Sequence, residues 1–121
     1  VHISFVEIFI NPFLSWSNEF IDKFIQESRD VIASLENDLI ELEKDLANES
    51  YIHNIFRHLH TIKGGALLLG FENLGNFIHE IETIFAMVRE GTKEIDDQVI
   101  SLAFQAVDHI YKVFDDPELE D

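Results

Sequence analysis

The residues of this 121-residue chain that are best suited to take part in a reaction lie in the stretch FRHLHTIKGGALLLGF, residues 56–71. At helical periodicity, Lys63 and Gly64 follow His60 by one turn, so the imidazole has an ammonium on one side and bare backbone on the other. Gly64 and Gly65 each cost about 1 kcal/mol against alanine in a helix interior, so their presence needs a reason beyond folding. A missing side chain at position 64 would leave room for a bulky group to reach His60.

A second group of residues that could take part in the chemistry lies in the stretch LGNFIHEIETIF. His79 and Glu82 are three positions apart there and share one flank of a helix. A carboxylate beside His60 would accept a hydrogen bond from one ring nitrogen, fix the tautomer, and leave the other nitrogen as a nucleophilic lone pair. A histidine, an orienting base, the Lys63 cation and an open approach at Gly64 are the parts needed to hold a transferable phosphoryl group.

Four amphipathic helices are expected to position these residues, because apolar side chains recur at three- and four-residue spacing along most of the chain. No credible strand pattern competes with them. The predicted fold class is therefore all-α, an up-and-down antiparallel four-helix bundle with an extra short amino-terminal segment. The expected helices run from Phe20 to Leu46, from a cap at Asn48 or Ser50 to Gly70, from Asn73 to Glu90 with Gly91 as the stop, and from Asp96 to Asp115.

Length and composition predict one compact domain, since 46% of the residues are apolar and can bury a core. The absence of cysteine excludes a disulfide framework and a thiol nucleophile, and it fits a reducing compartment. We divide the chain into an amino-terminal extension of unknown role at 1–16, the bundle at 17–115, and the start of an acidic linker at 116–121.

The formal net charge of −16 makes nucleic acid and membrane surfaces poor partners, because such binding depends on clustered lysine and arginine. An acidic surface suits partners with basic faces, although solubility alone also explains it. No run approaches the roughly 20 apolar residues of a membrane-spanning helix, and no basic n-region of a secretory signal opens the chain. We expect a cytoplasmic location.

The motifs HTIKGGALLLGF, LGNFIHEIETIF and VREG, in this order, closely resemble the histidine phosphotransfer (HPt) domain, and most of all the amino-terminal HPt domain of chemotaxis-type sensor histidine kinases. The resemblance extends more weakly over all but about the first 18 residues and the tail. It implies that His60 is the phosphoacceptor of a phosphorelay in a two-component system. A kinase catalytic domain, in the same polypeptide or complex, would phosphorylate it from ATP, and an aspartate of a response-regulator receiver would take the phosphoryl group.

The resemblance also implies roles for the neighbours of the phosphoacceptor. Lys63 would stabilise phosphoryl charge, and His79 with Glu82 would hydrogen-bond and tune the imidazole. Gly64 and Gly65 would let the partner's active site approach. Chemotaxis members usually have a glycine or small residue at the position of Leu67, which therefore bears on partner preference. It could enlarge an apolar docking surface or turn into the bundle.

The chain has no glycine-rich segment or phosphate-cradling motif for a nucleotide. It is therefore expected to be a covalent carrier and not an enzyme, with no cofactor of its own. ATP and Mg²⁺ would belong to the partner domains. An isolated domain of this type is normally monomeric.

Two other functions compete with the carrier. A metal-binding bundle would need inward Glu residues and Glu-x-x-His pairs. The chain contains no Glu-x-x-His, and its predicted inward stripes are aliphatic and aromatic. A plain helical interaction or dimerisation module would account for the acidic faces but not for the two glycines that follow His60. Surface or structural roles are expected for His53, His58 and His109, which have no matched set of partners.

Overall fold

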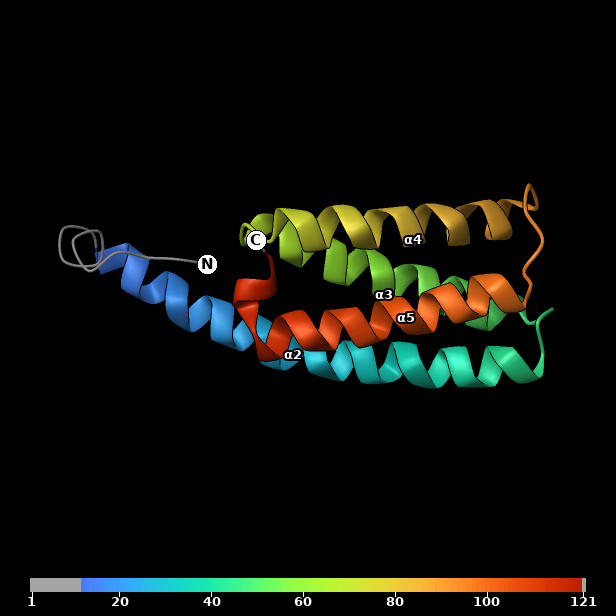
Figure 1. The fold of residues 1–121 in the computed structure, drawn as a ribbon, viewed down its shortest axis with the longest axis horizontal. Coiled ribbons are helices and arrows are strands. Elements are labelled where there is room, and N and C mark those ends of the chain that lie inside the picture. Colours follow the sequence, from blue (N-terminus) through green and yellow to red (C-terminus); the bar gives the residue numbers. More distant parts are fainter. Residues whose placement is uncertain (1–11, 121) are drawn as a thin grey trace.

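The computed structural model describes residues 12–120, which form four long helices followed by one short 3-10 turn (Figure 1). Helix α2 spans Pro12–Lys44, α3 spans Glu49–Leu68, α4 spans Glu72–Glu90, α5 spans Asp97–Asp115, and the turn η1 spans Pro117–Glu120. No strand occurs within 12–120. The predicted all-α four-helix fold is confirmed.

Short connections make successive helices antiparallel (Figure 1). Each helix contacts two neighbours: α2 packs on α3 and α5, and α4 packs on the same two helices. The contact between α3 and α4 is the most extensive, and these are the helices that carry the two groups of candidate residues.

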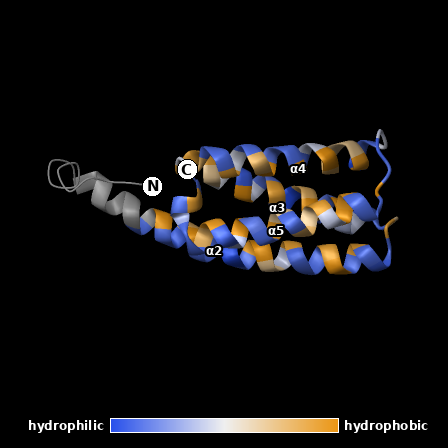
Figure 2. Cartoon of the chain, in the orientation of Figure 1, coloured by the Kyte–Doolittle hydropathy of each residue, from blue (hydrophilic) through white to orange (hydrophobic). Residues whose placement is uncertain are grey.

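The apolar stripes meet along the axis of the bundle, and hydrophilic residues cover the outside (Figure 2). This arrangement follows from the periodicity of the sequence, because only one face of each helix is apolar enough to be buried. The side chains that are fully enclosed include Ile32, Leu35, Leu39 and Leu42 from α2, Ile55, Leu59 and Ile62 from α3, Leu74, Ile78 and Phe85 from α4, and Ile110 from α5. Within the described part of the chain, no helix combines the length and apolarity needed to cross a bilayer.

Side chains at the helix ends satisfy backbone groups that the helices leave without partners. Asn48 caps α3, where its Oδ1 accepts a hydrogen bond from the Tyr51 amide at 3.2 Å. Asp96 caps α5 in the same way, at 2.9 Å from the amide of Val99. Gly91 ends α4 in the left-handed conformation, with φ of 82°, that favours glycine. Of the two predicted caps for α3, the structure selects Asn48.

Helix α2 begins earlier than predicted, at Pro12. Proline is well suited to a first helical position because its missing N–H has no helical acceptor there. Residues 12–16 therefore continue the first helix of the bundle, whereas 1–11 lie outside the described residues. The amino-terminal turns of α2 extend past the other helices (Figure 1).

The segment after α5 also differs from the expectation of a linker that starts at 116. The Glu120 carboxylate accepts hydrogen bonds from the backbone amides of Asn73 at 2.6 Å and Leu74 at 2.9 Å. Phe71, at the N-cap of α4, supplies no side-chain cap, and a carboxylate at a helix N-terminus is electrostatically favourable. Residues 117–120 therefore pack as part of the domain.

Candidate functional site

The carboxylate of Glu82 lies at the centre of the site, on the face of α4 that packs against α3. Its Oε2 is 2.7 Å from Nδ1 of His60, and its Oε1 is 2.7 Å from Nζ of Lys63. A longer contact of 3.4 Å joins Oε1 to Nδ1 of His79. The structure thus brings together the four residues that sequence analysis proposed for the chemistry.

Helix geometry explains how the four side chains meet. His60 and Lys63 are three positions apart on α3, and His79 and Glu82 have the same spacing on α4, so each pair projects from one flank of its helix. Buried neighbours anchor both flanks: Leu59 and Ile62 on α3, with Ile78 and Ile81 on α4. Because α3 and α4 are antiparallel and tightly packed, the two flanks face each other.

The side chain of Glu82 is only 8% exposed, whereas that of His60 is 65% exposed. Burial acts to raise the pKa of the Glu82 carboxyl, but the hydrogen bonds and charges of Lys63 and His60 outweigh it, and the pKa is lowered below its usual 4.5. Glu82 is therefore an anion at neutral pH. An ionised carboxylate only accepts hydrogen bonds, so the proton of a neutral His60 resides on Nδ1.

The tautomer set by Glu82 leaves Nε2 of His60 with its lone pair. Among the residues that the structure describes, no group is hydrogen-bonded to Nε2, and the ring projects from the bundle. A neutral imidazole held in this way is a competent nucleophile at an exposed position.

Lys63 places its ammonium beside the imidazole through their shared carboxylate. The side chain of Lys63 is 15% exposed and its Nζ donates to Oε1 of Glu82. His79 is 60% exposed and its longer contact with the same oxygen is a weaker constraint. Lys63 is therefore a built-in part of the site, and His79 lies at its edge.

The two adjacent glycines have different surroundings. A Cβ atom on Gly64 would have no atom within 4 Å, so this position is open to an approaching partner. A Cβ atom on Gly65 would overlap the ring of Phe24 from α2. Packing against Phe24 thus gives a reason for glycine at position 65 that the sequence did not indicate.

Leu67 lies one turn after Gly64 on α3, and its side chain is packed at one end and exposed to solvent elsewhere. Its side chain is partly packed, because the branched end fills the space that the missing Cβ of Gly75 leaves on α4. Leu67 nevertheless remains 41% exposed, and the neighbouring Leu68 is 84% exposed. Leu67 and Leu68 therefore form an exposed apolar surface next to Gly64.

An aromatic residue and a basic residue near the site were not predicted from the sequence. Phe56 is half-buried, and its ring stacks on the imidazole of His60. The guanidinium carbon of Arg89 lies 4.0 Å from the centroid of that ring. The four-residue spacing of Phe56 and His60 was a signal for the first contact, but no local pattern links Arg89 to it.

Two other histidines of the described region have partners outside this site. His58 pairs with Asp38 of α2 at 3.1 Å, which is a partner that sequence analysis did not identify. His109 packs edge-to-face on Phe77. Within residues 12–120, no three histidine, cysteine or acidic side chains are grouped so that they could hold a metal ion.

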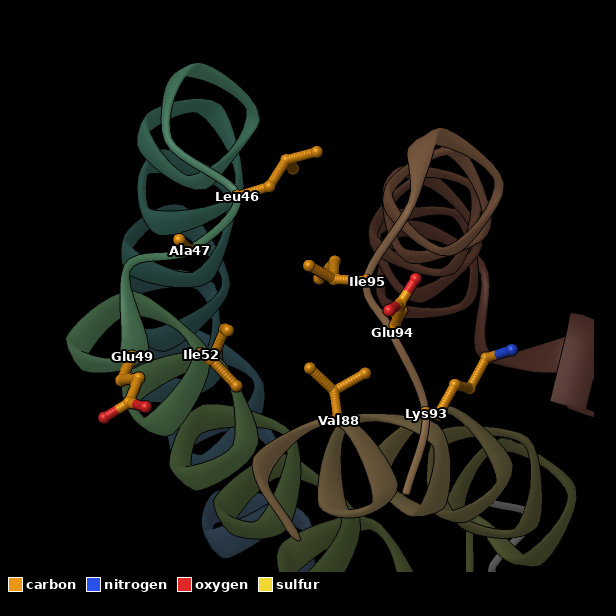
Figure 3. Close-up of a pocket in the computed structure, with 8 residues that line it drawn as sticks. All are labelled: Leu46, Ala47, Glu49, Ile52, Val88, Lys93, Glu94 and Ile95. Carbon is orange, nitrogen blue, oxygen red and sulfur yellow. The ribbon is translucent and has the colours of Figure 1, made fainter. Parts of the chain in front are cut away.

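A hollow of about 370 Å³ lies at the opposite end of α3, near the α2–α3 and α4–α5 connections (Figure 3). Apolar side chains point into it, and charged ones stand at its margin (Figure 3). Its lining consists of Leu46, Ala47, Glu49, Ile52, Val88, Lys93, Glu94 and Ile95. None of the site residues contributes to this hollow, so the candidate chemistry belongs to the outer surface of the α3–α4 pair.

Comparison with known proteins supports the same assignment. The sequence profile of the Hpt domain family matches residues 19–115. The chemotaxis protein CheA of Bacillus subtilis (strain 168) is 32% identical over 93 residues, which are 77% of this chain and 14% of that protein. For the chemotaxis protein CheA of Halobacterium salinarum, the identity is 31% over 99 residues, which are 82% of this chain and 15% of that protein. The chain thus spans a small part of the length of these relatives.

Two solved structures have a similar fold. The CheA phosphotransferase domain from Thermotoga maritima superposes with a TM-score of 0.78 at 31% identity, over 80% of this chain and 92% of that chain. A computationally redesigned four-helix bundle gives a TM-score of 0.76 at 24% identity, over 80% and 95% of the two chains, and shows the fold alone. Because the family profile covers most of its length, the chain belongs to the Hpt domain family, whose members are phosphotransfer carriers in two-component signalling and not catalytic domains.

Proposed function

We propose that His60 is the residue that carries the phosphoryl group, and that Nε2 is the atom to which it is attached. The observation that carries this proposal is the 2.7 Å hydrogen bond between Nδ1 of His60 and the buried carboxylate of Glu82. This bond commits Nδ1 as a donor and leaves the lone pair on Nε2.

In the first step, the Nε2 lone pair attacks the γ-phosphorus of ATP, and the bond from phosphorus to the bridging oxygen breaks. Its electron pair leaves with ADP. The imidazole keeps its Nδ1 proton and becomes positively charged as the N–P bond forms. The Glu82 carboxylate balances this charge, so the same contact that sets the tautomer also stabilises the product.

In the second step, a carboxylate oxygen of the receiver aspartate attacks the phosphorus. The N–P bond breaks, its electron pair returns to Nε2, and neutral His60 is restored. Transfer of this kind depends on alignment and on charge stabilisation, because little covalent chemistry is left to the carrier. The ammonium of Lys63 supplies positive charge on the carrier side.

The open surface at Gly64 fits a carrier that two different active sites must reach in turn. We assign the kinase role to a chemotaxis-type histidine kinase catalytic domain, in the same polypeptide or complex, and the acceptor role to a response-regulator receiver. ATP and Mg²⁺ are held by those partners, and the exchange takes place in the cytoplasm, where ATP is available. Leu67 and the exposed Leu68 beside the site form an apolar contact for these partners. The isolated domain acts as a monomer.

The experiment that tests this function is intact-protein mass spectrometry after incubation with magnesium, ATP and a liberated CheA-type kinase core. The wild-type domain should gain one acid-labile, base-stable phosphate, and the His60→Gln variant should gain none. Circular dichroism of His60→Gln should remain that of a folded helical bundle, because the side chain lies outside the core. A phosphate that persists in folded His60→Gln would refute the assignment of His60.

A further inference from the structure

The aromatic ring of Phe56 lies beside the proposed phosphoacceptor, one turn earlier on α3. The centroids of the Phe56 and His60 rings are 6.2 Å apart, and their planes differ by only 16°. This separation is within the range of offset-stacked aromatic pairs. Residues four apart are surface neighbours on a helix, so the backbone itself brings the two rings together.

The Phe56 ring is in turn held by Arg89, which lies in the last turn of α4. Its guanidinium carbon is 4.0 Å from the ring centroid, a short distance for a cation–π contact. No described carboxylate lies within ion-pair distance of Arg89. The Phe56 ring therefore has a defined partner, Arg89 of α4, in addition to His60.

The hydrogen bond to Glu82 holds one edge of the imidazole but leaves rotation about the Nδ1–Oε2 line. A parallel ring on one side restricts that rotation, because tilting the imidazole would bring it against Phe56 or open a gap in the stack. In-line attack requires the Nε2 lone pair to point at the phosphorus, so the rate depends on the plane of the ring as well as on its position.

We propose that Phe56, held in place by Arg89, is a positioning residue that sets the plane of the His60 imidazole for phosphoryl transfer. Glu82 selects the tautomer, and Phe56 selects the orientation. This inference rests on the proposed role of His60. It adds a second constraint, of apolar and cation–π origin, to the polar contacts already described.

The test compares Phe56→Leu with Phe77→Leu, a matched control in which a half-buried ring is removed from contact with another histidine, His109. With the domain as substrate for a CheA-type kinase core, Phe56→Leu should lower kcat roughly tenfold and leave KM unchanged. Phe56→Tyr should keep kcat near the wild-type value, because it retains an aromatic ring at this position. Arg89→Leu should lower kcat by a smaller factor.

Equal effects of Phe56→Leu and Phe77→Leu would overturn the proposal, as would a change in KM alone. A KM effect would assign Phe56 and Arg89 to partner docking. Arg57→Leu serves as the control for charge, because it removes an exposed arginine adjacent to Phe56 in the sequence.

A second readout does not depend on phosphorylation and therefore separates this inference from the proposed function. The ¹⁵N spectrum of the imidazole nitrogens should show mainly the Nδ1–H tautomer of His60 in the unmodified wild type. In Phe56→Leu these shifts should move toward the average of the two tautomers, because a ring free to tilt weakens its bond to Glu82. Shifts that stay at wild-type values in Phe56→Leu would overturn the positioning role, whether or not the domain accepts phosphate.

Discussion

Nδ1 of His60 lies 2.7 Å from Oε2 of Glu82, which joins an exposed imidazole on α3 to a buried carboxylate on α4. The other carboxylate oxygen holds Lys63 at the same distance. One buried anion thus sets the tautomer of a surface imidazole and keeps a cation next to it. The α3–α4 packing that stabilises the domain is also what assembles the site.

Removal of the carboxylate should slow phosphorylation without abolishing it. In Glu82→Ala, Nδ1 loses its acceptor and the imidazole divides between its two tautomers, so we expect a rate reduced roughly 10- to 100-fold. Glu82→Gln is the matched control, since its amide oxygen can still accept a hydrogen bond from Nδ1–H. Its rate should fall between those of wild type and Glu82→Ala. Single-turnover phosphorylation by a kinase core measures these rates, and a wild-type rate in Glu82→Ala would remove Glu82 from the mechanism.

The lowered pKa of Glu82 predicts how stability depends on pH. Its usual pKa is 4.5 and its folded-state pKa lies lower, so the folded state binds fewer protons at this group than the unfolded chain does. The resulting stabilisation is complete above the unfolded-state pKa and is lost as the pH falls through the folded-state value. Urea unfolding at neutral pH and at about pH 3 measures how much the free energy of unfolding falls on acidification. This decrease should be smaller for Glu82→Gln than for wild type. Parallel pH profiles for the two proteins would mean that the ion pair contributes no net stability.

The two glycines should separate function from folding. Gly64→Leu replaces a poor helix former at an open position, so it should keep or raise stability by up to about 1 kcal/mol while blocking transfer sterically. Gly65→Ala forces the Phe24 ring aside and should lower the free energy of unfolding by about 1–3 kcal/mol.

Chemical denaturation and receiver transfer assays on both glycine variants test this separation. Normal transfer by Gly64→Leu would refute the access argument. An unchanged stability of Gly65→Ala would refute the packing argument, and neither result bears on the other.

Leu67 and Gly75 should be energetically coupled, because the leucine side chain occupies the space above the glycine. Gly75→Ala alone should cost about 1–3 kcal/mol through overlap with Leu67. In a Leu67→Ala background, the same change should cost much less. A double-mutant cycle from unfolding curves measures this coupling, and additive effects would show that the contact has no energetic weight.

The helices and their ends could largely be predicted from local signals. Apolar periodicity located all four helices, and Asn48 and Gly91 act at the ends where capping chemistry indicated them. Asp96 was predicted only as the start of the last helix, and the structure shows that it is the N-cap. The start of α2 at Pro12 was missed, since the apolar run before Phe20 lacks a clear helical stripe. The cap that Glu120 provides for α4 was also missed, because Glu120 and Leu74 are 46 residues apart in the sequence.

The members of the site could be predicted, but not their full arrangement. Spacing placed His60 with Lys63 and His79 with Glu82 on two helix flanks, and it indicated a carboxylate near the imidazole. The contact of Gly65 with Phe24 and that of Arg89 with Phe56 depend on which faces of distant helices meet. Periodicity within one helix carries no information about such pairs.

NMR of the phosphorylated, ¹⁵N-labelled domain can identify the nitrogen of His60 that carries the phosphoryl group. The domain is prepared with magnesium, ATP and a CheA-type kinase core, and the ³¹P–¹⁵N coupling identifies the attached nitrogen. We expect a single coupling, to Nε2 of His60, with Nδ1 still protonated and hydrogen-bonded to Glu82. Phosphorus attached to Nδ1, or to any other residue, would refute the assignment to Nε2 of His60.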